Sequence, residues 1–177
     1  MQPAITLKLK IWMIPEPIPR GRCFRNLLQR NAPVGDRRLQ PAFLALAEAG
    51  ALRGCVLDIG IGEHALMAAA FGLEATGVDT AATAIALARA KAHNRGLSAH
   101  FLVRNALQLA SFGEQYDSVL DCGLFHVFDA GDRRSFVDHL AAVVRPGGRY
   151  FMLCFSELQR GDTGQLAHPP GIAAVLG

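Results

Sequence analysis

The sequence lacks any apolar run long enough to cross a membrane. A transmembrane helix needs about 20 consecutive, mainly apolar residues, and charged residues or prolines interrupt every apolar stretch of this 177-residue chain before that length. The N-terminus also lacks the unbroken apolar core of a secretory signal, because Lys8, Lys10 and several prolines interrupt it. The sequence therefore predicts a soluble, cytoplasmic protein whose length fits one domain.

Closely spaced cysteine pairs are also missing. The four cysteines, Cys23, Cys55, Cys122 and Cys154, are scattered along the chain. Structural zinc sites place cysteines a few residues apart, so we predict no metal site. Reduced thiols fit a cytoplasmic location.

Basic residues are scarce over most of the chain. Residues 1–40 hold eight Lys and Arg against two Asp and Glu, whereas residues 41–177 hold ten against thirteen. A nucleic-acid surface needs basic residues clustered on a folded face beside stacking aromatics, so we predict no nucleic-acid partner. Residues 1–38 are interpreted as a basic leader containing prolines, and within it the alternation from Ile5 to Ile11 is typical of a strand.

One stretch organises the rest of the sequence. The nearly continuous apolar run Cys55–Ile59 predicts a strand buried on both faces. Gly60 and Gly62 follow and predict a tight turn that lets the backbone approach a ligand, and a helix is expected from Glu63. The free N–H groups at a helix start face the same place. We therefore expect a nucleotide-like ligand at the carboxyl end of this strand.

Strands and helices alternate along the remainder of the chain. This alternation predicts an α/β fold with a doubly wound, mostly parallel sheet in a domain spanning residues 39–157. Residues 158–177 are interpreted as an irregular tail, with a short helix possible only over residues 172–176. The expected strands are 55–59, 75–79, 100–103, 116–122 and 149–155, and the expected helices are 39–52, 63–71, 81–94 (capped by Thr80 and stopped by Gly96) and 129–144, with a turn at 145–148.

Five motifs together resemble the class I S-adenosylmethionine-dependent methyltransferases of the small-molecule type. They are Val56–Gly62, Gly77–Asp79, Arg104–Ala106, Tyr116–Gly123 and Arg145–Arg149. The resemblance runs from about residue 39 to 155 and implies methyl transfer from S-adenosylmethionine to a small-molecule acceptor. The family sheet normally has a sixth and a seventh strand, which we predict to be missing in a C-terminally shortened relative. The exposed edge would then be covered by the tail, the leader or a second copy in a homodimer.

The resemblance also implies a role for individual residues. Asp58, in the first strand, corresponds to the acid that helps to bind the cofactor's ammonium group, and Asp79, which ends the second strand, to the acid that takes both ribose hydroxyls. Asn105, after the third strand, corresponds to the residue that binds the adenine amino group. Residues after the fourth strand flank the sulfonium. No catalytic residue is assigned, because an activated donor mainly needs alignment with its acceptor. The predicted cofactor-binding residues are Asp58, Gly60, Gly62, His64, Asp79, Thr80, Asn105, Ala106, Asp121 and Cys122.

Several alternatives remain open in the sequence. His64 either replaces the third glycine of the family turn or follows a turn that is two residues shorter. Asn105 binds adenine or shapes a turn, and His126 is a general base or a loop histidine.

Two other functions are compatible with the chain. A non-catalytic relative is one. A nicotinamide oxidoreductase is the other, because Gly60, Gly62 and Ala65 satisfy the relaxed dinucleotide fingerprint. Asp58 argues against the second, since dinucleotide folds favour an apolar residue beside the pyrophosphate.

Overall fold

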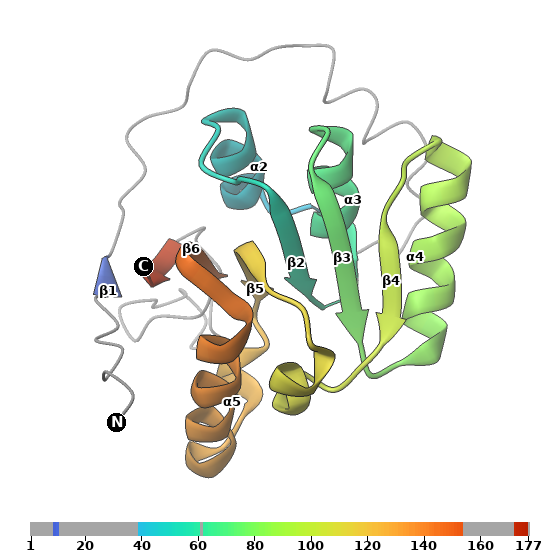
Figure 1. Ribbon diagram of the computed structural model, residues 1–177. Coiled ribbons are helices and arrows are strands. Elements are labelled where there is room, and N and C mark those ends of the chain that lie inside the picture. The colour runs from blue at the N-terminus through green and yellow to red at the C-terminus, as the bar shows by residue number, and fades with distance from the viewer. Residues whose placement is uncertain (1–8, 11–38, 61, 154–171, 177) are drawn as a thin grey trace, which may run out of the picture.

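A seven-stranded sheet forms the centre of the computed structural model, which describes residues 9–10, 39–60, 62–153 and 172–176. Strands β2 to β6 are parallel, as predicted, whereas β7 is antiparallel to β6 and β1 is antiparallel to β7 (Figure 1). The spatial order is β1-β7-β6-β5-β2-β3-β4. The strands are β1 Leu9–Lys10, β2 Cys55–Ile59, β3 Glu74–Asp79, β4 His100–Val103, β5 Tyr116–Cys122, β6 Val144–Leu153 and β7 Ile172–Leu176.

Helices cover both faces of this sheet, which confirms the doubly wound fold. On one face lie α2 (Pro41–Glu48), α3 (Glu63–Ala70) and α4 (Ala82–Arg95), and on the other lie α5 (Ala130–Val143) and the short 3-10 helix η1 (Ala106–Phe112). A second 3-10 helix, η2 (Phe125–Val127), follows β5. Side chains of a strand alternate between faces. Val56 of β2 therefore joins the core under α3, and Leu57 joins the core under α5.

The ends of the helices follow the expected chemistry, with one exception. Pro41 opens α2, and Gly96 ends α4 with a φ of 63°. The prediction that Thr80 caps α4 is wrong. Ala81 occupies the cap position without a side-chain hydrogen bond, and the carboxylate of Asp79 accepts the Ala81 N–H at 2.8 Å. The Asp79 carboxylate, which is a stronger acceptor than the Thr80 hydroxyl, therefore takes the Ala81 N–H.

The expected turn at residues 145–148 is part of β6. Tyr116 of β5 pairs with Val144 and Ser118 pairs with Arg149, so two steps along β5 correspond to five along β6. The additional residues bulge out of the ladder, and Gly147 supplies the positive φ of 77° that this requires. The strand thus begins before the turn rather than after it.

The sheet continues past its fifth parallel strand. The prediction of a loop or short helix at Ile172–Leu176 is wrong, because this segment is β7 and pairs along β6 with Phe151 opposite Val175. Leu9 and Lys10 of β1 then pair with β7, within the alternating segment that predicted a strand. The β6 edge is therefore covered, and the exposed edge that motivated a homodimer is absent from the described part of the chain. The rest of the predicted leader and tail lies outside the described residues.

No helix in the described ranges combines the length and the apolarity that a membrane span requires.

Candidate functional site

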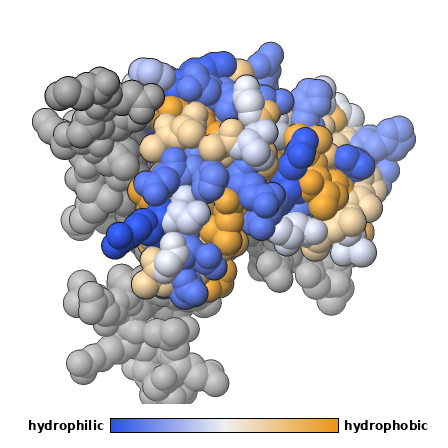
Figure 2. Space-filling view, turned by 60° about the horizontal axis from the view of Figure 1, so that its bottom comes forward, coloured by the Kyte–Doolittle hydropathy of each residue, from blue (hydrophilic) through white to orange (hydrophobic). Residues whose placement is uncertain are grey.

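The predicted site residues gather at the edge formed by the carboxyl ends of the parallel strands. Strands β2 and β3 are neighbours, with Ile59 opposite Val78, so Asp58 and Asp79 lie near the same edge. Backbone hydrogen bonds join the strand ends, because Gly60 N–H donates to Val78 at 2.9 Å and Arg104 N–H donates to Asp79 at 3.0 Å. In Figure 2 the side of the molecule that lies lowest in Figure 1 comes forward, and hydrophobic residues are exposed there among hydrophilic ones.

Gly60 and Gly62 contribute to this edge in different ways. Gly62 is the cap residue of α3 with a φ of 85°, and a Cβ there would lie 2.8 Å from the Phe101 ring and 2.9 Å from the Ala88 methyl. Glycine is therefore required by both conformation and packing. Gly60 has a φ of 155°, and nothing lies within 4 Å of the position of a Cβ. Its backbone borders open space that a ligand can approach.

The Asp58 carboxylate is almost completely buried, with 1% exposure. Its Oδ2 accepts the Ala65 N–H at 3.1 Å, and its Oδ1 lies 3.6 Å from Nδ1 of His64. Among the described residues no Lys or Arg forms an ion pair with it. A buried carboxylate is costly unless it is paired, so this group suits a cationic ligand.

His64 lies in the first turn of α3, under the glycine turn rather than within it. The side chain is buried, its Nε2 accepts the Gln40 N–H at 3.4 Å, and its ring meets the Phe43 ring edge to face at 4.6 Å between centroids. The helix register thus matches the interpretation of a turn two residues shorter. The structure places His64 against α2 and Asp58.

Asp79 is the last residue of β3, and Thr80 follows it. One oxygen of Asp79 accepts the Ala81 N–H, and no described donor takes the other. Asp79 is partly exposed and Thr80 is exposed. The carboxylate can therefore still accept hydroxyl hydrogens from a ligand.

Asn105 and Ala106 follow β4. Oδ1 of Asn105 accepts the Leu107 N–H at 3.0 Å and caps η1, which is the turn-shaping alternative for this residue. Ala106 is buried in the core under α5.

Asp121 and Cys122 end β5 with different surroundings. The Asp121 carboxylate is fully buried and accepts the N–H groups of Leu124 at 2.7 Å and Phe125 at 3.1 Å and the Tyr150 hydroxyl at 2.7 Å. Burial raises the pKa of Asp121, and these hydrogen bonds oppose that rise. Asp121 therefore holds η2 against β6, whereas Cys122 is exposed at the strand end.

The segment after β5 adds apolar residues that the sequence analysis did not assign. Phe125 and Phe128 both pack on Phe136 of α5, with centroid distances of 6.0 and 5.4 Å, and Val127 beside them is 67% exposed. His126 is half-buried, and its carbonyl accepts from Arg133 at 3.1 Å. The dense aromatic spacing directly after a strand was the available signal for an apolar surface here. We call residues 124–128 the apolar lip.

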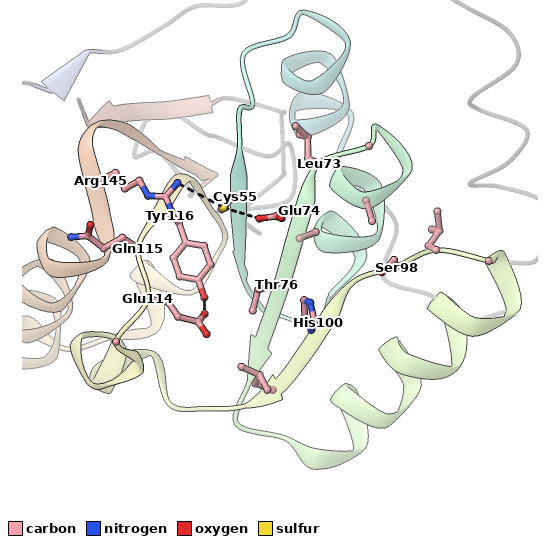
Figure 3. Close-up of a pocket in the computed structure, with 17 residues that line it drawn as sticks. Cys55, Leu73, Glu74, Thr76, Ser98, His100, Glu114, Gln115, Tyr116 and Arg145 are labelled. Carbon is pink, nitrogen blue, oxygen red and sulfur yellow. Dashed lines mark hydrogen bonds between the residues drawn. The ribbon is translucent and has the colours of Figure 1, made fainter.

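A depression of about 1080 Å³ lies at the opposite edge, near the amino ends of the strands (Figure 3). Its lining includes Cys55, Glu74, Tyr116 and Arg145. The Cys55 thiol donates to Glu74 at 3.0 Å, and this acceptor together with burial raises the pKa of Cys55. A neutral thiol is a poor nucleophile, and none of the predicted cofactor-binding residues lines this depression. Within the described ranges no group of three His, Cys, Asp or Glu side chains is arranged to hold a metal ion.

Comparison with known proteins identifies related sequences. A family model described as a methyltransferase domain matches residues 56–148. The chain is 35% identical over 141 residues to the 2-heptyl-1-hydroxyquinolin-4(1H)-one methyltransferase of Mycobacteroides abscessus, covering 78% of this chain and 62% of that protein. It is also 35% identical over 156 residues to the demethylmenaquinone methyltransferase of Thermus thermophilus, covering 86% of this chain and 68% of that protein.

Solved structures give the same picture. One determined for the conversion of a disulfide bond into a thioacetal group during echinomycin biosynthesis matches with a TM-score of 0.66 and 40% identity, over 74% of this chain and 57% of that one. The PH0226 protein of Pyrococcus horikoshii matches with a TM-score of 0.58 and 26% identity, over 64% of this chain and 51% of that one. The chain thus spans about three fifths of the length of the first sequence relative and of the first structure.

Proposed function

Because the chain belongs to the methyltransferase domain family, we propose that it transfers a methyl group from S-adenosylmethionine to a small-molecule acceptor. The family match confirms the resemblance and the cofactor class that the motifs predicted. The observation that carries the proposal is the buried Asp58 carboxylate, which has no Lys or Arg partner in the described chain and lies at the same edge as Asp79.

The residues at this edge fit the chemical groups of the cofactor. Asp58 would hold the ammonium group, the remaining oxygen of Asp79 would accept ribose hydroxyls, and the open backbone at Gly60 would border the methionine part. The sulfonium supplies an activated methyl group. The chain therefore needs only to bind and align both partners and to exclude water from between them.

The acceptor that suits this site is a small ring compound with an apolar body. The apolar lip offers Phe125, Val127 and Phe128 directly after β5, where the resemblance locates the sulfonium end. The names of the two relatives above also denote ring compounds as their substrates. We further propose a cytoplasmic location and no nucleic-acid partner, from the cysteine usage and the charge distribution of the sequence.

Calorimetric titration with S-adenosylmethionine and S-adenosylhomocysteine tests the cofactor assignment. We expect dissociation constants below about 1 mM; absence of binding to both ligands would overturn it. In a thermal-shift assay, stabilisation by NADH alone would instead support the nicotinamide alternative.

Activity is tested by release of S-adenosylhomocysteine with a panel of hydroxylated bicyclic ring compounds. Turnover with at least one of them is the expected result. Cofactor binding without turnover on any acceptor would support the non-catalytic alternative.

A further inference from the structure

His64 contacts both Asp58 and the start of α2, although it lies below the surface of the site. The residue is 5% exposed, and its ring lies between the Phe43 ring, the Gln40 N–H and the Asp58 carboxylate. Both ring nitrogens face groups of the chain, Nε2 the Gln40 N–H and Nδ1 the Asp58 carboxylate, so neither is directed at a ligand in the glycine turn. What it changes is the environment of Asp58.

The hydrogen bond from Gln40 determines the tautomer of this histidine. A ring nitrogen that accepts a hydrogen bond carries no proton, and Nε2 accepts the Gln40 N–H at 3.4 Å. The single proton of the neutral ring is therefore on Nδ1, which is the nitrogen that faces Asp58. His64 thus presents an N–H group to the Asp58 carboxylate.

The two oxygens of Asp58 are consequently not equivalent. Oδ2 takes the Ala65 N–H at 3.1 Å, whereas Oδ1 lies 3.6 Å from Nδ1 of His64, which is longer than a hydrogen bond. Oδ1 thus feels the field of the N–H group and retains the capacity to accept a stronger donor. A primary ammonium is such a donor.

We propose that His64 is a positioning residue for cofactor binding: as the Nδ1–H tautomer it holds the Asp58 carboxylate with Oδ1 directed toward the ammonium group of S-adenosylmethionine. This inference rests on the proposed function. Phe43 and Gln40 hold the ring in place, so the start of α2 contributes to the cofactor site without touching the ligand.

Two substitutions of similar size test the roles of the two ring nitrogens separately. In His64→Asn the amide can still donate from the place of Nδ1 but no longer reaches Gln40. In His64→Gln the amide oxygen can still accept from Gln40 in the place of Nε2, but no donor faces Asp58. A purely structural role predicts the greater loss for His64→Asn, and the positioning role predicts it for His64→Gln.

Two ligands, one with and one without the ammonium group, give a second test. S-adenosylhomocysteine carries the ammonium group, and 5′-methylthioadenosine lacks the amino-acid part altogether. Loss of the N–H group that faces the buried Asp58 carboxylate is expected to weaken binding about tenfold. We expect His64→Gln to raise the dissociation constant of S-adenosylhomocysteine by about that factor and to change that of 5′-methylthioadenosine by no more than about twofold. His64→Asn should change the dissociation constant of either ligand by no more than about threefold, as measured by calorimetry. His93→Gln on exposed α4 surface is the matched control and should change neither.

The inference is overturned if His64→Gln leaves S-adenosylhomocysteine binding unchanged, weakens both ligands equally, or is matched by His64→Asn. Nitrogen-15 NMR of the unsubstituted chain gives an independent readout that needs no variant. A His64 ring protonated at Nδ1 alone is expected, and protonation at Nε2 would refute it. If the unsubstituted chain binds neither ligand, the proposed function itself fails.

Discussion

At the scale of single residues, Asp58 and Asp79 share an edge but have different environments. Asp58 is buried and close to an imidazole, whereas Asp79 is partly exposed and uses one oxygen for the Ala81 N–H. Parallel topology made their common location predictable, because carboxyl ends of adjacent parallel strands meet at one edge. The orientation of His64 was not predictable, since it depends on contacts with Phe43 and Gln40 from a separate helix.

Asp79→Asn should weaken S-adenosylhomocysteine binding about tenfold, because an amide has one acceptor oxygen where a carboxylate has two. The folded structure should be little affected, since the remaining oxygen can still accept the Ala81 N–H. Calorimetry measures the affinity, with Asp138→Asn on exposed α5 surface as the control. Unchanged affinity would remove Asp79 from the cofactor site.

Tyr150→Phe should lower the free energy of unfolding by about 2 kcal/mol at about pH 8, because it removes a hydrogen bond to the buried Asp121 carboxylate. Burial raises the pKa of Asp121 in the folded chain, so the folded state binds the proton more tightly. The stabilisation that protonated Asp121 contributes is therefore present at low pH. It is lost as pH rises from the pKa of Asp121 in the unfolded chain to its higher pKa in the folded chain.

The Tyr150 hydroxyl lowers the pKa of Asp121 and so favours the charged form. The difference in the free energy of unfolding between Tyr150→Phe and the unsubstituted chain should consequently shrink as pH falls through the pKa of Asp121. Urea denaturation across pH measures it. A difference that grows toward acid pH would contradict the assignment.

At the scale of elements, Glu63 joins the start of α3 to the end of α4. Its carboxylate lies 2.6 Å from the Lys91 ammonium and 3.1 Å from the Arg95 guanidinium, and both Glu63 and Arg95 are nearly buried. This pair of contacts fixes the helix that carries the glycine turn. The sequence could not predict these ion pairs, because the partners are about thirty residues apart in the chain.

Glu63→Gln should reduce the free energy of unfolding by about 3 kcal/mol, since it leaves the buried Arg95 without its counter-charge. Arg95→Met should cost more than Lys91→Met, because the Lys91 side chain is 26% exposed and remains hydrated. Urea denaturation is the measurement, with Arg134→Met on exposed α5 surface as the control. Equal costs for the two basic residues would argue against this ranking.

Gly62→Ala should be clearly more destabilising than Gly72→Ala. Both glycines have positive φ, but only at Gly62 would the new methyl meet Phe101 and Ala88 below 3 Å. We expect losses of about 3 and about 1 kcal/mol, respectively, because overpacking adds to backbone strain. Thermal unfolding checks the order. Similar losses would mean that α3 shifts to accommodate the methyl group.

Strands with a clear local pattern were predicted with accurate bounds, and elements that depend on distant partners were not. The observed bounds of β2, β4 and β5 match the sequence because apolar runs end at glycines or polar residues there. In contrast, Ile172–Leu176 has no alternation, and its extended form is set by hydrogen bonds to β6. The capping by Asn105 and the burial of Asp121 also depend on side-chain geometry that spacing does not encode.

At the scale of the whole molecule, the two ends of the described chain complete one side of the sheet. Strand β7 pairs with β6 on one side and with β1 on the other, which puts it three strands away from β2. The edge that carries the candidate site and the strands at the two ends of the described chain are therefore separate parts of one sheet (Figure 1). Changes at β7 should alter stability more than cofactor affinity.

Val175→Pro tests this separation. Val175 is paired with Phe151 and with Lys10, so proline removes a ladder donor between two strands. The melting temperature should fall by about 5 °C or more, with cofactor affinity in the remaining folded protein unchanged. Ala174→Pro is the matched control, because the register of β7 slips there and Ala174 has no assigned partner. An equal effect of both variants would show that β7 is not held by its ladder.

The pairing of Leu9 with Leu176 has a mechanical consequence. In this antiparallel pair the two residues lie at the same end of the short ladder, so tension applied between them would separate β1 from β7 like a zipper, one residue pair after another. Such loading meets little resistance at each step. Strands β6 and β5 stand between the pulled segments and β2, and would shield the glycine turn from the applied force until the outer strands have come away.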